Sequence, residues 1–198
     1  LTAEKTAVRI FNWTNGEEAK ATINMNGGEI YSKNGYGINV NSGNAPFVAL
    51  NIAGGTITTD YADYKLAVYV VNKGTAENFT ANVTGGTFNG IFALNGVTAQ
   101  TMKQGAVAVS GGTFEGVTCY EDPAYGFVSG GTFKSAVDAK AVATGFICKD
   151  NANGTFGVIV DPKHGMVAQI IRNDYYAENQ YFATINDAVQ AAQNGETV

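Results

Sequence analysis

A pair of adjacent glycines recurs five times along this chain of 198 residues, in the segments NMNGGEI, NIAGGTI, NVTGGTF, AVSGGTF and FVSGGTF. Measured between first glycines, successive copies are 27, 31, 26 and 19 residues apart. The position two before that glycine and the position three after it are apolar in every copy: Met25, Ile52, Val83, Val109 and Val128, then Ile30, Ile57, Phe88, Phe114 and Phe133. The positions directly flanking each pair are small or polar. This alternation predicts two short strands meeting at a sharp bend, because glycine readily adopts positive φ.

A further strand-like run lies between the bends, in GYGINVN, AVYVVN and IFALN, which end at Asn41, Asn72 and Asn95. One repeat cannot bury its apolar side alone, but copies stacked about 4.8 Å apart would form continuous apolar columns. Chain twist favours a right-handed connection between parallel strands. The pattern therefore predicts an all-β fold, a single-stranded right-handed parallel β-helix, followed by a short C-terminal helical segment. One column contains Asn24, Asn51 and Asn82, for which we expect a structural amide ladder rather than a binding row.

An antiparallel sandwich with a hairpin at each glycine pair is the rival fold. Hairpins would reverse the strand direction at every turn, and they would not require the same residue type at the same offset in five copies. The matched columns therefore favour the solenoid.

The pattern changes after the last glycine pair. The stretch KSAVDAKAVATGFICKDNANGTFGVIVDP predicts the closing coils, with a turn at DNANG. Farther on, Thr184 is a good helix N-cap, Ile185, Ala188, Val189 and Ala192 share one face, and Gly195 is a stop signal. A narrow apolar stripe of this kind suits a helix laid over the end of a solenoid. We expect a β-helix over residues 1–160, and over 161–198 a segment with one amphipathic helix that opens a next module.

The glycine repeats, the stretch AVATGFICKDNANGTFGVIV and the ending YFATINDAVQAAQNGETV carry a family resemblance. Over roughly residues 20 to 198 the chain resembles the Gly-rich GGTF-repeat β-helix modules, of pectin-lyase-like fold, in large secreted and surface proteins of gut-type anaerobic bacteria. In that family the pattern Y-x-T-x-x-A-V-x-A-A-x-x-G-x-T-V opens the next module, and this chain has one extra residue between Tyr181 and Thr184. The resemblance implies a bacterial protein that is secreted or held at the cell surface, with neighbouring modules of the same polypeptide as partners.

Composition narrows the classes of partner. The chain has 12 basic and 17 acidic residues and a net charge of -5, so we expect no nucleic-acid partner. No apolar run is long enough to span a bilayer, which predicts no membrane insertion. The two cysteines, Cys119 and Cys148, stand in apolar contexts typical of small buried hydrophobes, and the sequence leaves open whether they pair.

Enzymes of the pectate-lyase type share the predicted fold, and they place several acidic residues on adjacent coils to hold Ca²⁺, beside an Arg or Lys that abstracts a proton. Among the columns that flank the glycine pairs, the only acidic residue is Glu29. The two arginines, Arg9 and Arg172, lie at opposite ends of the chain. The lone His164 stands beyond the repeats, as a surface residue would. The best acidic groups are Asp60 with Asp63, and Glu121 with Asp122, both in inserted loops. They leave Ca²⁺ binding open, although solvated turn residues are the commoner reading, and we expect no catalytic residues and no other cofactor.

Aromatic residues are the better lead, because sugars stack their apolar faces on exposed rings. The candidates Tyr31, Tyr36, Tyr61 and Tyr64 fall in neighbouring repeats, with Tyr69 close by. The opposing interpretation is that Tyr69 belongs to the core and the others are ordinary half-exposed residues of β structure. We expect a non-catalytic surface or secreted module, an adhesin or rigid spacer that binds a polysaccharide or a host or cell-surface glycan through these tyrosines. The alternatives are a polysaccharide lyase or hydrolase and a purely structural stalk repeat.

Overall fold

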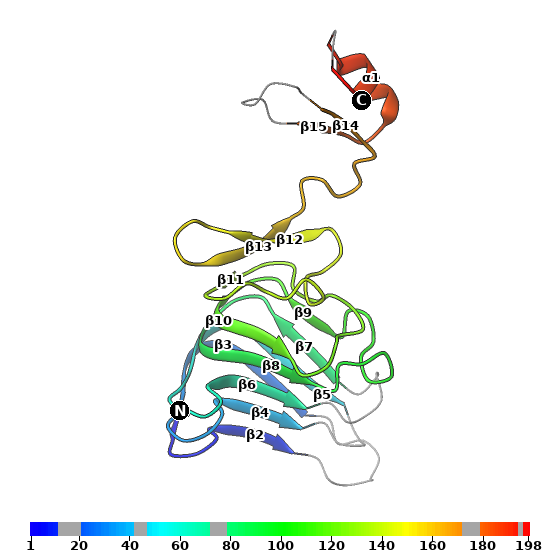
Figure 1. Ribbon diagram of the computed structural model, residues 1–198. Helices are drawn as coiled ribbons and strands as arrows, with labels where there is room; N and C mark the ends of the chain where they lie inside the picture. The colour runs from blue at the N-terminus through cyan, green and yellow to red at the C-terminus, as the bar shows by residue number, and fades with distance from the viewer. Residues whose placement is uncertain (12–20, 42–46, 72–78, 172–178, 194–195) are drawn as a thin grey trace. The chain divides into compact units, whose positions relative to one another are not determined.

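The computed structural model describes residues 1–11, 21–41, 47–71, 79–171, 179–193 and 196–198 (Figure 1). The chain divides into two compact units, Leu1–Ile159 and Val160–Val198, which are described separately. The first is a parallel β-helix of about four turns, which confirms the predicted fold class. The antiparallel sandwich is thereby excluded, because the ladders between successive coils are parallel.

Three runs of strands build the β-helix, and some long strands bend from one run into the next. The first run contains the leading halves of β3 (Ala21–Ser32) and β5 (Val48–Thr59), then β7 (Phe79–Val83) and β9 (Val107–Val109). The second contains β1 (Thr2–Ala3), the trailing halves of β3 and β5, the starts of β8 (Thr87–Asn95) and β10 (Thr113–Cys119), and β11 (Thr132–Phe133). The third contains β2 (Val8–Phe11), β4 (Ile38–Asn41), β6 (Leu66–Val71) and the ends of β8 and β10.

The predicted apolar columns form the core of this unit. Ile57, Phe88, Phe114 and Phe133 lie in successive register on the second run and are at most 1% exposed. The Phe114 ring lies parallel to two neighbours, with centroids 4.4 Å from Phe88 and 5.0 Å from Phe133. Repetition of one residue type at one offset from the glycine pair therefore yields a continuous aromatic stack.

The two glycines of a pair serve different purposes. At Gly86 φ is +100°, so this second glycine makes the bend in the left-handed region. At Gly85 a Cβ atom would lie 2.5 Å from the carbonyl oxygen of Ala53 on the preceding coil. The first glycine is therefore needed because two coils approach closely there.

The asparagine column is present in register, with Asn51 paired to both Asn24 and Asn82. The Asn51 Nδ2 donates to Asn24 Oδ1 at 2.9 Å, as expected for an amide ladder. The alignment of the third run on Asn72 was wrong by one residue. Asn41 and Asn95 both pair with Val71, and Asn72 lies outside the described residues.

The end of the β-helix differs from the predicted closing coils. One further parallel contact joins Val128 to Val142. After it, β12 (Phe146–Asp150) and β13 (Phe156–Val160) are joined by the predicted turn, where Asn151 N donates to Thr155 O at 2.9 Å. Because β13 pairs antiparallel with β11, this segment reverses the chain direction instead of adding a coil.

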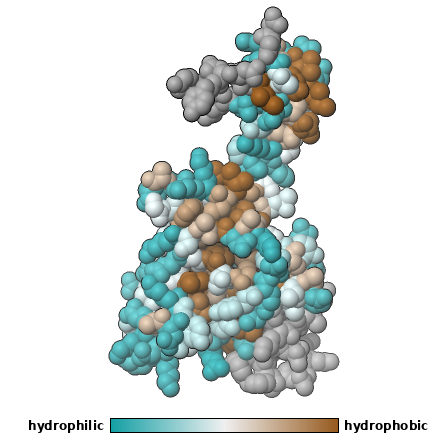
Figure 2. Space-filling model, in the orientation of Figure 1, coloured by the Kyte–Doolittle hydropathy of each residue, from teal (hydrophilic) through white to brown (hydrophobic). Residues whose placement is uncertain are grey.

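The second unit contains the antiparallel pair β14 (Ala168–Ile170) and β15 (Gln180–Phe182) and the helix α1 (Ile185–Ala191). Thr184 is the N-cap, and its Oγ1 accepts from Asp187 N at 3.1 Å. The predicted apolar face is only partly buried, because Ala188 is buried whereas Ile185 and Val189 are 64% and 56% exposed, and Figure 2 shows hydrophobic surface on this unit. The predicted stop at Gly195 lies outside the described residues.

Candidate functional site

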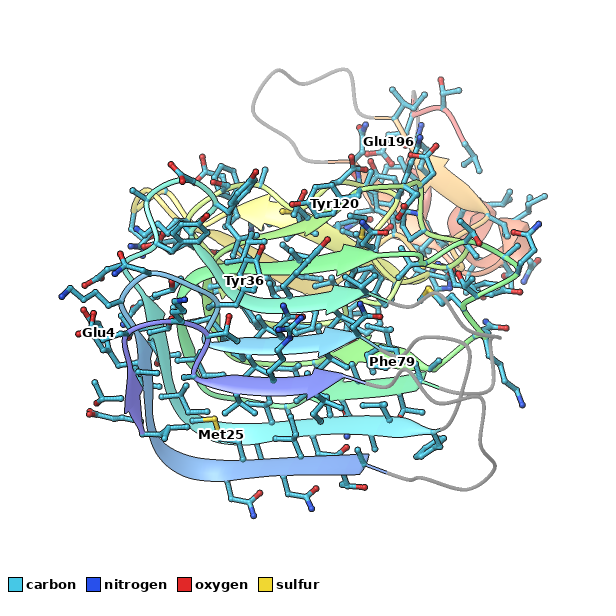
Figure 3. The ribbon with its side chains drawn as sticks, turned by 90° about the horizontal axis from the view of Figure 1, so that it is seen from below. Glu4, Met25, Tyr36, Phe79, Tyr120 and Glu196 are labelled. Atoms are coloured by element: carbon cyan, nitrogen blue, oxygen red, sulfur yellow. The ribbon has the colours of Figure 1, made fainter. Side chains whose placement is uncertain are left out.

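Five tyrosine rings form a continuous chain of contacts on the outside of the β-helix. Tyr36 lies 5.2 Å from Tyr69 and 6.2 Å from Tyr61, measured between ring centroids. Tyr61 continues to Tyr64 at 5.7 Å, and Tyr69 continues to Tyr120 at 6.0 Å. We call this set, Tyr64, Tyr61, Tyr36, Tyr69 and Tyr120, the tyrosine strip. In Figure 3, Tyr36 and Tyr120 lie on one side of the unit, away from Met25 and Phe79.

The third run of strands positions the strip. Tyr36 precedes β4, Tyr61 and Tyr64 lie in the loop between β5 and β6, and Tyr120 directly follows β10. Tyr69 lies within β6 between the buried residues Val68 and Val70, so the pleat turns its side chain outward. The interpretation of Tyr69 as a core residue is therefore wrong.

Tyr69 is held in place by the next coil. Its register partner on β8 is Ala93, which has no exposed surface. The Asn95 Nδ2, two residues farther along β8, donates to the Tyr69 hydroxyl at 3.4 Å. This bond is long and correspondingly weak, but it connects the ring to the coil that separates Tyr69 from Tyr120.

Exposure varies along the strip. Tyr64 and Tyr120 at the two ends are 55% and 53% exposed, and Tyr61, Tyr36 and Tyr69 between them are half-buried. Burial, followed by the neighbouring tyrosines, raises the pKa of Tyr36, and burial likewise raises the pKa of Tyr120. Both phenols are therefore neutral at physiological pH, each with an apolar ring face and a hydroxyl that donates and accepts hydrogen bonds.

A cleft of about 460 Å³ adjoins the strip and shares Tyr36 and Tyr61 with it. Its other lining residues come from the first two coils: Glu4, Lys5, Thr6, Asn34 and Gly35. The Tyr36 backbone N–H donates to Thr6 Oγ1 at 3.4 Å, and the Lys33 ammonium lies 3.2 Å from Glu4. The volume is within the usual range for small-ligand sites, and polar groups lie beside the aromatic rings.

Tyr31, predicted with the other tyrosines, lies elsewhere. It pairs with Thr58 on the second run, and its hydroxyl donates to Asp60 Oδ2 at 2.6 Å. This hydrogen bond raises the pKa of Tyr31. Tyr31 and Asp60 therefore form a surface pair, and the structure brings together only Tyr36, Tyr61 and Tyr64 of the four predicted tyrosines.

The acidic loop residues are engaged separately. Glu121 Oε2 accepts from Gly96 N at 2.8 Å, and Asp122 Oδ2 lies 2.5 Å from the Lys140 ammonium. Asp63 is exposed in the loop that carries Tyr61 and Tyr64. Within the described parts of the chain, no group of three or more His, Cys, Asp or Glu residues is arranged to hold a metal ion.

The remaining titratable candidates are two cysteines and a histidine. Cys119 and Cys148 are both free and half-buried, which answers the question of pairing. Burial, with smaller effects of Asp138 and Glu121, raises the pKa of Cys119 to about 12. His164 is exposed in the second unit, as a surface residue would be.

Comparison of the chain with models of protein families, with curated proteins and with solved structures finds no match. No helix in the described ranges is long and apolar enough to cross a membrane.

Tyr120 was not among the tyrosines predicted from the sequence, although a signal for it existed. Its predecessor Cys119 pairs with Leu94, so aligning VTCY with FALN places Tyr120 one coil beyond Asn95.

Proposed function

We propose that this chain is a non-catalytic β-helix module that binds a glycan through the tyrosine strip. The module belongs to a secreted or surface protein of a bacterium and acts as an adhesin or spacer. The observation that carries the proposal is the continuous series of ring contacts from Tyr64 to Tyr120. Sugar rings expose apolar C–H faces that pack on aromatic rings, and their hydroxyls bond to polar groups beside those rings.

The framework of the strip supports recognition by a preformed surface. Tyr69 lies in β6, and its neighbours Val68 and Val70 are fully buried. Tyr36 lies two residues before the start of β4, and its backbone N–H donates to Thr6 Oγ1 on the preceding coil. Rings fixed by regular strands lose little conformational freedom when a ligand binds, and this favours affinity.

The arrangement of the carboxylates supports binding without catalysis. Lyases of the β-helix type gather carboxylates on adjacent coils, whereas Asp60, Glu121 and Asp122 each contact a different partner. Ca²⁺ is included in the test because Asp63 is an exposed carboxylate in the loop that carries Tyr61 and Tyr64.

A glycan array probed with the purified chain, with and without Ca²⁺, is the direct test, followed by isothermal titration with each retained glycan. Tyr36→Ala and Tyr69→Ala should weaken binding about tenfold or more, because truncation of a central aromatic anchor typically has that effect. Tyr125→Ala is the matched control, since Tyr125 is an exposed tyrosine outside the strip.

Three results would argue against the proposal. Retention that survives both strip variants would place binding elsewhere on the chain. Turnover of a retained polysaccharide would overturn the non-catalytic assignment in favour of a lyase or hydrolase. If no glycan on the array binds the chain, the alternative of a purely structural stalk repeat would be favoured.

A further inference from the structure

We infer that the chain has a second binding site, separate from the tyrosine strip, which takes a small hydrophobic amine. Such a ligand has an apolar or aromatic body and carries one ammonium group. The site is a cleft of about 590 Å³ at the end of the β-helix, within the first unit. Its lining comes from the irregular segment before β12, from β12 itself and from Phe156 on β13. The volume is within the usual range for small-ligand sites.

The cleft lies where the stacking of coils stops. Val109, Val128 and Val142 follow one another in one column, and the first two have no exposed surface. The chain then reverses into β12 and β13 instead of adding a coil, so the column ends at the half-buried Val142, which lines the cleft. Two exposed alanines, Ala136 and Ala139, belong to the same wall. Their small side chains leave room for an apolar ligand body.

One face of β12 supplies the other wall. Phe146, Cys148 and Asp150 occupy alternate positions of the strand, so they share a face, and all three line the cleft. Four residue steps of a strand amount to about 13 Å, which sets the length of this row. Cys148 Sγ accepts from Val137 N at 3.4 Å, and Val137 belongs to the opposite wall. The two walls are therefore connected before any ligand binds.

The charge of the cleft indicates the polar end of the ligand. Asp150 is the one charged residue in its lining, and it stands at the end of the β12 row. Its Oδ1 accepts from Ala152 N at 2.7 Å, and none of the ion pairs in the described ranges uses it. The adjacent Lys149 alternates to the opposite face of β12 and does not line the cleft. An apolar cleft with one carboxylate at its end matches an apolar body with a cationic end.

Calorimetric titration of the full chain at pH 7 tests the ligand class. The probes are naphthylmethylamine, the neutral naphthylmethanol, the anionic naphthoate, and methylamine, which lacks the apolar body. The aromatic amine should bind about two- to fivefold more tightly than the alcohol, the factor for an exposed ion pair. Naphthoate should bind more weakly than the alcohol, and methylamine should show no saturable binding, because burial of the apolar body drives association.

Two variants and a control locate the site. Ala139→Trp should weaken all three naphthyl probes about tenfold or more, because the larger side chain fills the cleft from an exposed position. Ala99→Trp is the matched control, since Ala99 is exposed and does not line the cleft. Asp150→Asn should bring the amine down to the affinity of the alcohol and leave the alcohol unchanged, because Asn keeps the oxygen that accepts from Ala152 N.

The outcomes are separate from those of the glycan experiments, because none of the five tyrosines of the strip lines this cleft. Tyr36→Ala should therefore leave the affinity for naphthylmethylamine unchanged. Equal binding of the amine and the alcohol by the unmodified chain, or a preference for the amine that survives Asp150→Asn, would refute the assignment of the ligand class. Unchanged binding in Ala139→Trp, or failure of every naphthyl probe to bind, would refute the cleft as the site.

Discussion

The phenylalanine stack offers the sharpest test of how this chain folds. Phe114 is 1% exposed, and its ring lies parallel to Phe88 and Phe133, at centroid distances of 4.4 and 5.0 Å. Phe114→Ala should lower the free energy of unfolding by about 3–5 kcal/mol, the range for a buried phenylalanine that leaves a cavity. The upper half of that range is expected, because each ring pair contributes roughly 0.5–1.5 kcal/mol beyond area burial.

Phe133→Ala is the matched comparison. Phe133 is also fully buried, but in the stack it contacts only Phe114, so its loss should be smaller by about one ring pair, ~0.5–1.5 kcal/mol. Urea unfolding followed by far-ultraviolet circular dichroism on the full chain measures both values. A loss below about 1.5 kcal/mol for Phe114→Ala, or a larger loss for Phe133→Ala, would refute the column as the main source of stability.

Three further predictions concern the other column, a thiol and the strip. Val83→Asp should cost more than about 4 kcal/mol and Val83→Thr much less, measured by the same unfolding assay, because Val83 is fully buried and a lone carboxylate would have no partner there. In a Cys148→Ser background, Cys119 should react with iodoacetamide about a thousandfold more slowly in the folded than in the unfolded chain at pH 8. Folding raises the pKa of Cys119 from 9.0 to about 12, so below pH 9 the folded chain holds far less thiolate than the unfolded chain. The difference between the two reaction rates should fade as the pH rises through 12. Equal rates at pH 8 would contradict the burial of this thiol. Tyr69→Phe should retain most of the glycan affinity that Tyr69→Ala loses, since stacking needs the ring and the bond from Asn95 is long; equal losses in titration would show that the hydroxyl dominates.

The sequence was sufficient for the columns that the glycine pairs anchor. At Gly85 the preceding coil leaves no room for a Cβ atom, and at Gly86 the backbone has positive φ, so glycine is required at both positions. Because glycine is required at these two positions, every copy of the repeat has the same register. The apolar positions two before and three after the pair then follow from that register. Fold class, column register and the asparagine pair Asn24–Asn51 were all accessible in this way.

The third run lacks such an anchor, and the errors are concentrated there. The bend before β6 contains Lys65 with positive φ, a signal that composition does not reveal. The ladder there also shifts register between Leu66 and Val68. A period of two residues tolerates no slip, so the alignment on Asn72 put Tyr69 on the inward face. The antiparallel direction of β13 was missed for a related reason, because an alternating strand looks the same in either direction.

The continuity of the tyrosine strip depends on the coil of β8, which lies between Tyr69 and Tyr120 and contributes no ring to the strip. Tyr69 on β6 and Tyr120 after β10 are separated by β8, and two coil spacings amount to about 9–10 Å. Their ring centroids are nevertheless only 6.0 Å apart, so the two side chains must lean toward each other across β8. Ala93, the register partner of Tyr69 on β8, is small enough to lie beneath the rings without exposed surface. A large side chain at this position would separate the Tyr120 ring from the Tyr69 ring, so the contact between them depends on the small side chain of Ala93.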